Sequence, residues 1–369
     1  YRLSTNQNLE GKLNEALSSI NRAIKINPSG VIAYSLRSEI KFSMGNYDQA
    51  IYDIDFALNI NPNIASLYGS RGWINFKKDK YNDAILDLKK AIEKDAEYFY
   101  AYELLSQIKL INKDYFNAIS DLNIALDLQP NNSNILMRRG IVKMKLKSYK
   151  EAILDFNKSI TINPKNEDAY LNLIETKRLS GDYEGALTNI NELLSINNKN
   201  HVAYFLRGQI NHSKSDYKSA ITEYNRAIKL NKDFGKAYIS RGYAKLGGSK
   251  NFDSIYDFDK AIDLQSKLKN SQDKNKSLSE AWAGLAVAKL NLKRYQDSIL
   301  DFNKAIELNP ENSYALMWRG ISWHDQGEYT NSISDLNKSI KIAPNHAYAY
   351  ARRGDTRLKQ GNTSAACRD

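Results

Sequence analysis

The sequence predicts an all-α fold built from antiparallel helix pairs. The first observation is a 34-residue period, in which NYDQAIYDIDFALNINP at residues 46–62 returns as RYQDSILDFNKAIELNP at residues 294–310. The second is that apolar residues recur at helical spacing in two blocks of each repeat. The third is that all six prolines fall on one repeat position, at the end of the second block. A proline there ends a helix.

The period divides the chain into ten repeats that follow a partial repeat at residues 1–30. Residues 46 and 294 differ by seven periods of 34 residues plus ten extra residues, which we place at about 269–278 between two repeats. The repeats start at residues 31, 65, 99, 133, 167, 201, 235, 279, 313 and 347. We expect residues 1–369 to form a single solenoid.

Each repeat is expected to contain a helix A, a tight turn and a helix B. Apolar residues at repeat positions 3, 4, 8, 10 and 12 indicate helix A, and those at positions 17, 20, 21, 24, 27 and 28 indicate helix B. A break at positions 15–16, as in MGNY at residues 44–47, separates them. Small residues at positions 8, 20 and 27 allow the helix axes to approach closely, while aromatic residues at position 4 fill the space around them.

This pattern resembles the tetratricopeptide repeat family, which has a large residue at position 4, Gly at 8, Tyr at 17, Ala at 20 and 27, and Pro at 32. The resemblance covers essentially the whole chain. It implies an open right-handed alpha-alpha superhelix whose A helices line a concave, partner-binding face. Stability is then expected to be a sum over repeats and their interfaces with neighbours.

Position 7 departs from the family pattern because it is arginine in seven repeats, while position 23 is mostly acidic. Position 11, one helical turn from position 7, is Lys, Asn or Arg in nine of the ten repeats. We interpret these residues as a ladder of internal ion pairs. The alternative is a row of arginines that receives acidic ligands.

The repeat that starts at Glu167 lacks both charges, with Leu173 at position 7 and Asn189 at position 23. It also carries bulky residues, Ile174 and Leu193, where other repeats have small ones. Wider helix packing follows, so we expect a bend or a softer joint near residues 167–234. The polar, Lys-rich extra residues at 269–278 are expected to form an exposed loop or to extend a B helix, with a partner-contact loop as the alternative.

Composition and motifs argue against several classes of protein. No apolar run is long enough to span a membrane, and Cys367 alone excludes an internal disulfide framework. The four histidines have no metal-site spacing, and no phosphate-binding glycine motif or nucleophile elbow occurs. We therefore expect no enzyme activity, cofactor or metal. The net charge of +11 is spread along the chain, which disfavours nucleic acid as a partner.

By family resemblance, positions 2, 5, 9 and 12 of the A helices line the groove. The apolar candidates for partner binding are Phe42, Trp73, Phe76, Met137, Ile141, Met144, Leu171, Phe205 and Tyr243. The polar candidates are Glu39, Glu103, Gln107, Glu175, Gln209 and His212. Packing between neighbouring A helices is the alternative role. A clamp for chaperone C-terminal tails is disfavoured, since no Lys or Arg occupies position 5 and no Asn occupies position 9.

The favoured function is a non-catalytic adaptor that holds a peptide or a helix of a protein partner in its groove. Two alternatives remain: binding of nucleic acid by a basic solenoid, and regulation of a larger enzyme, since similar arrays occur in some glycosyltransferases and phosphatases. The chain lacks an initial Met and its last repeat is incomplete, so we expect a fragment of a longer protein. The sequence favours a soluble, cytoplasmic protein.

Overall fold

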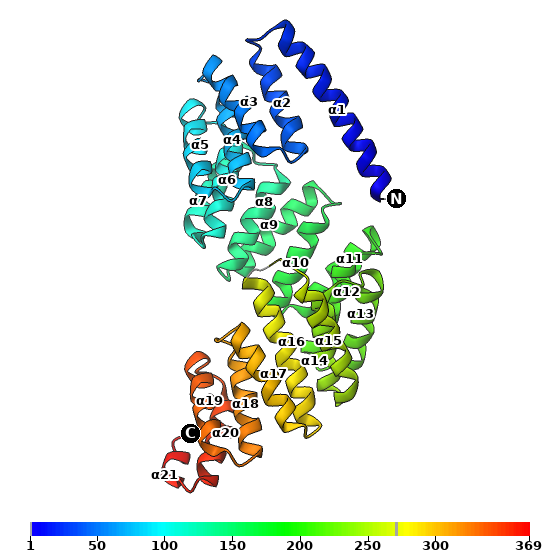
Figure 1. The fold of residues 1–369 in the computed structure, drawn as a ribbon, viewed down its shortest axis with the longest axis vertical. Coiled ribbons are helices and arrows are strands. Elements are labelled where there is room, and N and C mark those ends of the chain that lie inside the picture. Colours follow the sequence, from blue (N-terminus) through cyan, green and yellow to red (C-terminus); the bar gives the residue numbers. More distant parts are fainter. Residues whose placement is uncertain (1, 270–271) are drawn as a thin grey trace. The chain divides into compact units, whose positions relative to one another are not determined.

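The computed structural model describes residues 2–269 and 272–369, with side chains described from residue 11 onward except that of Gln272. These residues form helices and no strand (Figure 1), so the predicted all-α class is confirmed. The chain divides into two compact units, residues 1–180 and 181–369. The boundary lies inside the repeat that starts at Glu167. The softer joint expected near residues 167–234 stays a prediction.

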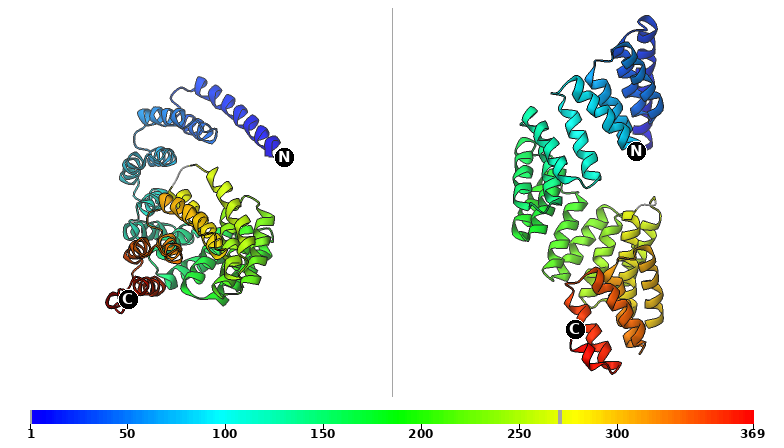
Figure 2. Two further views of the ribbon diagram at one scale, coloured as in Figure 1. Left: turned by 60° about the horizontal axis from the view of Figure 1, so that its bottom comes forward. Right: turned by 90° about the vertical axis from the view of Figure 1, so that its left-hand side faces the viewer.

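The first unit contains helices α1 to α10, which alternate between B and A helices. The B helices are α1 (Arg2–Ile26), α3 (Tyr47–Ile60), α5 (Tyr81–Lys94), α7 (Tyr115–Leu128) and α9 (Tyr149–Ile162). The A helices are α2 (Val31–Ser43), α4 (Ala65–Lys77), α6 (Phe99–Ile111), α8 (Ser133–Lys145) and α10 (Glu167–Ser180). Successive pairs follow one another as a stack, from blue to green in Figures 1 and 2.

The second unit contains helices α11 to α21 in the same alternation. The B helices are α11 (Tyr183–Ile196), α13 (Tyr217–Leu230), α15 (Asn251–Ser266), α17 (Tyr295–Leu308), α19 (Tyr329–Ile342) and the short α21 (Thr363–Ala366). The A helices are α12 (His201–Ser213), α14 (Gly235–Gly247), α16 (Gln272–Asn291), α18 (Ser313–Asp325) and α20 (Ala347–Lys359). Within each unit, helix B packs on helix A of its own repeat and of the next repeat.

Helix A starts at the predicted first residue of nine repeats, and the exception follows the extra residues. There α16 starts at Gln272 instead of Ser279, and α15 is two residues longer than most other B helices. Residues 272–278 therefore extend an A helix at its N-terminal end. The expectation of a loop or an extended B helix is wrong for these residues, because the preceding B helix ends at Ser266. Residues 270–271 of the predicted segment lie outside the described residues.

The core is built on the small residues that the period places at positions 20 and 27. Ala50, Ala84 and Ala118, for example, are fully buried. Position 8 is small because helices A and B are in close contact there. A Cβ on Gly140 would lie 2.7 Å from the ring of Phe156, at position 24 of the same repeat. Close helix contact therefore leaves room for a large aromatic residue.

The predicted ladder of ion pairs is present. In the repeat that starts at Ser313, Arg319 Nε donates to Asp335 at 2.7 Å and Nη2 donates to the other carboxylate oxygen at 2.8 Å. Arg319 Nη1 donates to Asn303 of the preceding repeat at 2.7 Å. The acidic residue at position 23 likewise accepts hydrogen bonds from Nε and Nη2 of Arg37, Arg71, Arg139, Arg207, Arg241 and Arg353. Each arginine is therefore held inside the solenoid by its own acidic partner.

Candidate functional site

A cavity of about 650 Å³ opens on the A-helix side of the first unit. Its lining comes from four successive A helices, α2, α4, α6 and α8, together with Leu88 of α5 and Tyr98 in the turn before α6. Small residues at positions 8, 20 and 27 allow helices A and B of each repeat to pack closely. The stacking of these pairs places successive A helices along one side of the unit. The cavity is called the α2–α8 groove below.

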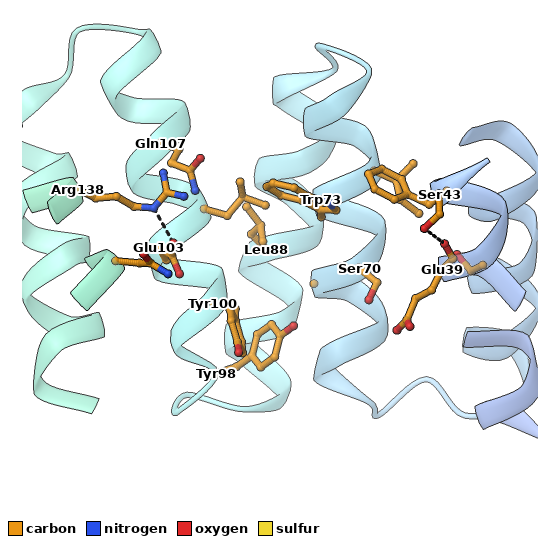
Figure 3. Close-up of a pocket in the computed structure, with 16 residues that line it drawn as sticks. Glu39, Ser43, Ser70, Trp73, Leu88, Tyr98, Tyr100, Glu103, Gln107 and Arg138 are labelled. Carbon is orange, nitrogen blue, oxygen red and sulfur yellow. Dashed lines mark hydrogen bonds and ion pairs between the residues drawn. The ribbon is translucent and has the colours of Figure 1, made fainter. Parts of the chain in front are cut away.

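Aromatic side chains occupy the middle of the α2–α8 groove. Figure 3 shows Trp73 of α4 near Leu88, between α2 and α6, with Tyr98 and Tyr100 further along the groove at the start of α6. Trp73 stacks on Phe76 with ring centroids 5.7 Å apart, and Phe76 in turn contacts Tyr81 at 5.8 Å. Gly69, which also lines the cavity, has no Cβ, and an added Cβ would lie 2.4 Å from the Tyr98 ring. Trp73, Tyr98 and Tyr100 therefore give the groove an aromatic floor.

Charged side chains lie on both sides of these rings (Figure 3). On the α6–α8 side, Arg138 Nε donates to Glu103 Oε1 at 2.6 Å. On the α2 side, the exposed Glu39 carries the other carboxylate of the lining. A tyrosine hydroxyl is protonated at neutral pH and can donate a hydrogen bond. Burial raises the pKa of Tyr98 further.

Family models match three stretches of the chain. Two described as "Tetratricopeptide repeat" match residues 133–166 and 279–312, and one described as "TPR repeat" matches residues 208–247. The first stretch is α8 with α9, the helix pair that closes one end of the groove. The chain therefore contains tetratricopeptide repeats.

Two solved structures share this tetratricopeptide fold. One is a tetratricopeptide repeat protein from Parabacteroides merdae ATCC 43184, with a TM-score of 0.57 and 20% identity over 68% of this chain and 98% of that one. The other belongs to the APC/C hetero-tetramer Cut9–Hcn1, with a TM-score of 0.55 and 14% identity over 95% of this chain and 94% of that one. A search among curated proteins found no match.

The α2–α8 groove brings together five of the side chains proposed from the sequence for partner binding. These are Glu39, Phe42, Trp73, Glu103 and Gln107. Sequence reasoning missed Ser70, Leu104 and Arg138, which share position 6, and Tyr98 at position 34. Tyr100 and Asn134 were not named as candidates either. Their repeat position, position 2, could have identified them, because the family pattern assigns it to the groove.

The other candidates of the first unit lie outside the α2–α8 groove. Met137, Ile141 and Met144 are partly buried against a core formed by Ala152, Phe156 and Leu173. Leu171 is half-buried, and Glu175 forms an ion pair with Arg178 at 2.8 Å. Phe76 stacks on Trp73 but does not itself line the cavity.

In the second unit, the candidates are spread over separate contacts. Phe205 is buried against Phe234 at 5.0 Å, Gln209 is half-buried, and the ring of His212 meets Tyr217 at 5.5 Å. Burial lowers the pKa of His212. Phe205 therefore packs between helices, the alternative role named for these residues.

A second, smaller cavity of about 350 Å³ lies beside Tyr243 and is also lined by Lys276, Glu280 and Tyr314. The Tyr243 hydroxyl donates to the Glu280 carbonyl oxygen at 2.9 Å. Burial raises the pKa of Tyr243 well above its usual value, raises that of Tyr314 to about 12, and raises that of the Glu280 carboxyl. Lys276 comes from the N-terminal extension of α16, so the extra residues contribute to this wall.

Among the described residues, no group of three or more His, Cys, Asp or Glu side chains is arranged to hold a metal ion. No helix in the described ranges combines the length and the apolar character that crossing a membrane requires. The α2–α8 groove contains aromatic surface, hydrogen-bond donors and two carboxylates. These groups can make apolar contacts, hydrogen bonds and ion pairs with a ligand.

Proposed function

We propose that this chain is a non-catalytic scaffold that binds an extended segment of a partner protein in the α2–α8 groove. The tetratricopeptide fold supports a role in protein–protein interaction. The observation that carries the proposal is the cavity of about 650 Å³, which lies within the usual size range of ligand sites and has an aromatic floor.

The dimensions of the groove suit an extended peptide. Its lining crosses four successive A helices, and packed helices lie about 9 Å apart. An extended chain advances about 3.3 Å per residue. The groove therefore has room for about eight residues of a partner, more than a single side chain or a small metabolite requires.

Polar groups in the groove are available to the backbone of such a peptide. Among the described residues, the indole nitrogen of Trp73, the amide of Gln107 and the hydroxyl of Tyr98 have no hydrogen-bond partner. An extended peptide has unpaired N–H and C=O groups along its length. Hydrogen bonds from the groove would satisfy some of them and fix the position of the segment.

Affinity capture with groove variants tests the proposal. The immobilised chain is exposed to a proteome, and bound proteins are quantified for the wild type, Trp73→Ala and Tyr100→Ala. Leu154→Ala is the control, because Leu154 is 68% exposed on α9 and lies outside the groove. We expect the amounts of bound groove partners to fall by about tenfold or more for Trp73→Ala and Tyr100→Ala, because aromatic residues that a partner covers on binding dominate binding energies.

The control variant should retain the partners that the wild type binds. A photo-reactive residue placed at Gln107 should form crosslinks to the bound segment and identify its sequence. Partners retained equally by all variants would reject the groove as the binding site.

A further inference from the structure

The α2–α8 groove contains one carboxylate that is not neutralised by the chain. Glu103 is held by Arg138 at 2.6 Å. Glu39 is exposed and forms no side-chain hydrogen bond or ion pair with any described residue, and Figure 3 shows its carboxylate extending beside Ser70 into the groove. The chain as a whole carries a net charge of +11. The α2 end of the groove is therefore acidic in a basic protein.

Two rings near the α2 end of the groove are already in contact with a cation of the chain itself. Lys77 Nζ lies 4.4 Å from the centre of the Trp73 ring and 5.7 Å from that of Phe76. Aromatic faces attract ammonium and guanidinium groups through their quadrupole. A carboxylate beside such rings provides both elements that stabilise a basic side chain.

An acidic ligand finds no matching partner in the same place. Arg138 is the single cation among the described residues that line the groove, and its Nε is already bonded to Glu103. A second carboxylate at the α2 end would be repelled by Glu39, and the nearby Lys77 is already in contact with the Trp73 and Phe76 rings.

We infer that the groove selects a partner segment in which a lysine or arginine lies next to an aromatic or long aliphatic residue. The basic side chain pairs with Glu39, and the apolar one packs on Phe42 and Trp73. This inference rests on the proposed function and names the class of its partner. It differs from the tail-clamp mode that the sequence disfavours, in which basic groove residues bind an acidic ligand.

Selection from a displayed library of random twelve-residue peptides tests the inference. The baits are the wild type, Glu39→Lys, Trp73→Ala and a matched control, Glu151→Lys, in which an exposed glutamate of α9 outside the groove receives the same change. We expect the wild type and the control to enrich peptides with a basic residue beside an apolar one. Glu39→Lys should instead enrich peptides that contain Asp or Glu.

A binding titration of the best wild-type peptide gives the size of the effect. Fluorescence anisotropy should show affinity reduced about fivefold for Glu39→Gln, the upper value for an exposed ion pair. Raising the salt concentration should weaken binding to the wild type more than to Glu39→Gln. Circular dichroism of Glu39→Gln should match the wild type, because the side chain is exposed.

The outcomes separate the inference from the proposed function. Peptides that depend on Trp73 but show no basic preference, or bind equally to Glu39→Gln, overturn the inference and leave the groove as a binding site. Enrichment of acidic peptides by the wild type overturns it too. Peptides unaffected by Trp73→Ala, or no enriched peptide at all, overturn both.

Discussion

A single arginine at repeat position 7 joins three helices. Arg319 of α18 bonds through two nitrogens to Asp335 of α19 and through the third to Asn303 of α17. Asp335 is nearly buried, and its side chain is 6% exposed. A buried carboxylate is costly unless it is paired with a cation. The ladder therefore fixes the contact between one repeat and the next, besides holding each helix pair together.

Replacing only Arg319 should lower the free energy of unfolding more than replacing Arg319 and Asp335 together. We expect Arg319→Leu to lower the free energy of unfolding of this region by about 3 kcal/mol, because Asp335 stays buried without its partner. The double variant Arg319→Leu with Asp335→Asn should return to within about 1 kcal/mol of the wild type. Leu173 and Asn189 form that combination naturally in the repeat that starts at Glu167.

Hydrogen exchange of backbone amides in α19 measures both variants. The single variant Asp335→Asn completes the double-mutant cycle and reports the coupling between the two side chains. Equal losses for Arg319→Leu and for the double variant would contradict the interpretation of the pair as a buried, matched unit.

Asp121 is an acidic residue of the ladder without an arginine, since position 7 of its repeat is Leu105. Lys109 Nζ lies 2.6 Å from the Asp121 carboxylate. Burial raises the pKa of Asp121, and the lysine offsets that effect only in part. The folded state thus binds a proton at Asp121 more tightly than the unfolded chain does.

The sign of the pH dependence follows from this raised pKa. The stabilising contribution of Asp121 is complete below its unfolded pKa of about 3.9 and is lost as pH rises through its higher folded pKa. Relative to the wild type, Asp121→Asn should therefore gain stability as pH rises through that range. Urea unfolding at a series of pH values measures the difference. A constant difference between the two proteins, or one of opposite sign, would refute the assignment.

At the scale of elements, the turn between helices A and B repeats one backbone conformation. Position 15 has a positive φ in all ten repeats, with glycine at four of them and a residue such as Lys147 (φ 62°) at the other six. The sequence break predicted the turn but not its left-handed conformation, because six of these residues are not glycine. For a residue with a Cβ, the left-handed backbone conformation costs about 1–2 kcal/mol.

Lys147→Gly should therefore stabilise the protein by about 0.5–1 kcal/mol, since the relief of strain exceeds the entropy that glycine adds to the unfolded chain. Gly327→Lys, the reverse change at φ 81°, should destabilise by a similar amount. A Cβ at Gly327 meets no atom within 4 Å, so backbone strain alone is tested. Thermal unfolding midpoints should shift in opposite directions, and shifts of the same sign would reject the argument.

The periodic pattern predicted most helix boundaries because the same few side chains recur in every repeat. The N-terminal extension of α16 was not predicted, because the polar residues before Ser279 have no apolar periodicity that marks a helix. In the groove, Trp73 and Glu39 could be found from their repeat positions. Ser70 and Arg138 could not, because whether position 6 faces the cavity depends on how the neighbouring A helix is placed, which the spacing within one helix does not encode.

At the scale of the whole molecule, the main contacts among the described helices of each unit join a helix to its nearest and next-nearest neighbours. Stability is then close to a sum of local terms, and damage in one repeat should spread only over adjacent repeats. We expect Arg319→Leu to increase hydrogen exchange in α17 to α20 and to leave α4 to α7 unchanged. A protein with one shared core would lose protection everywhere. Peptide affinity at the α2–α8 groove should also be unchanged in this variant, because recognition there depends on the helices that form the groove.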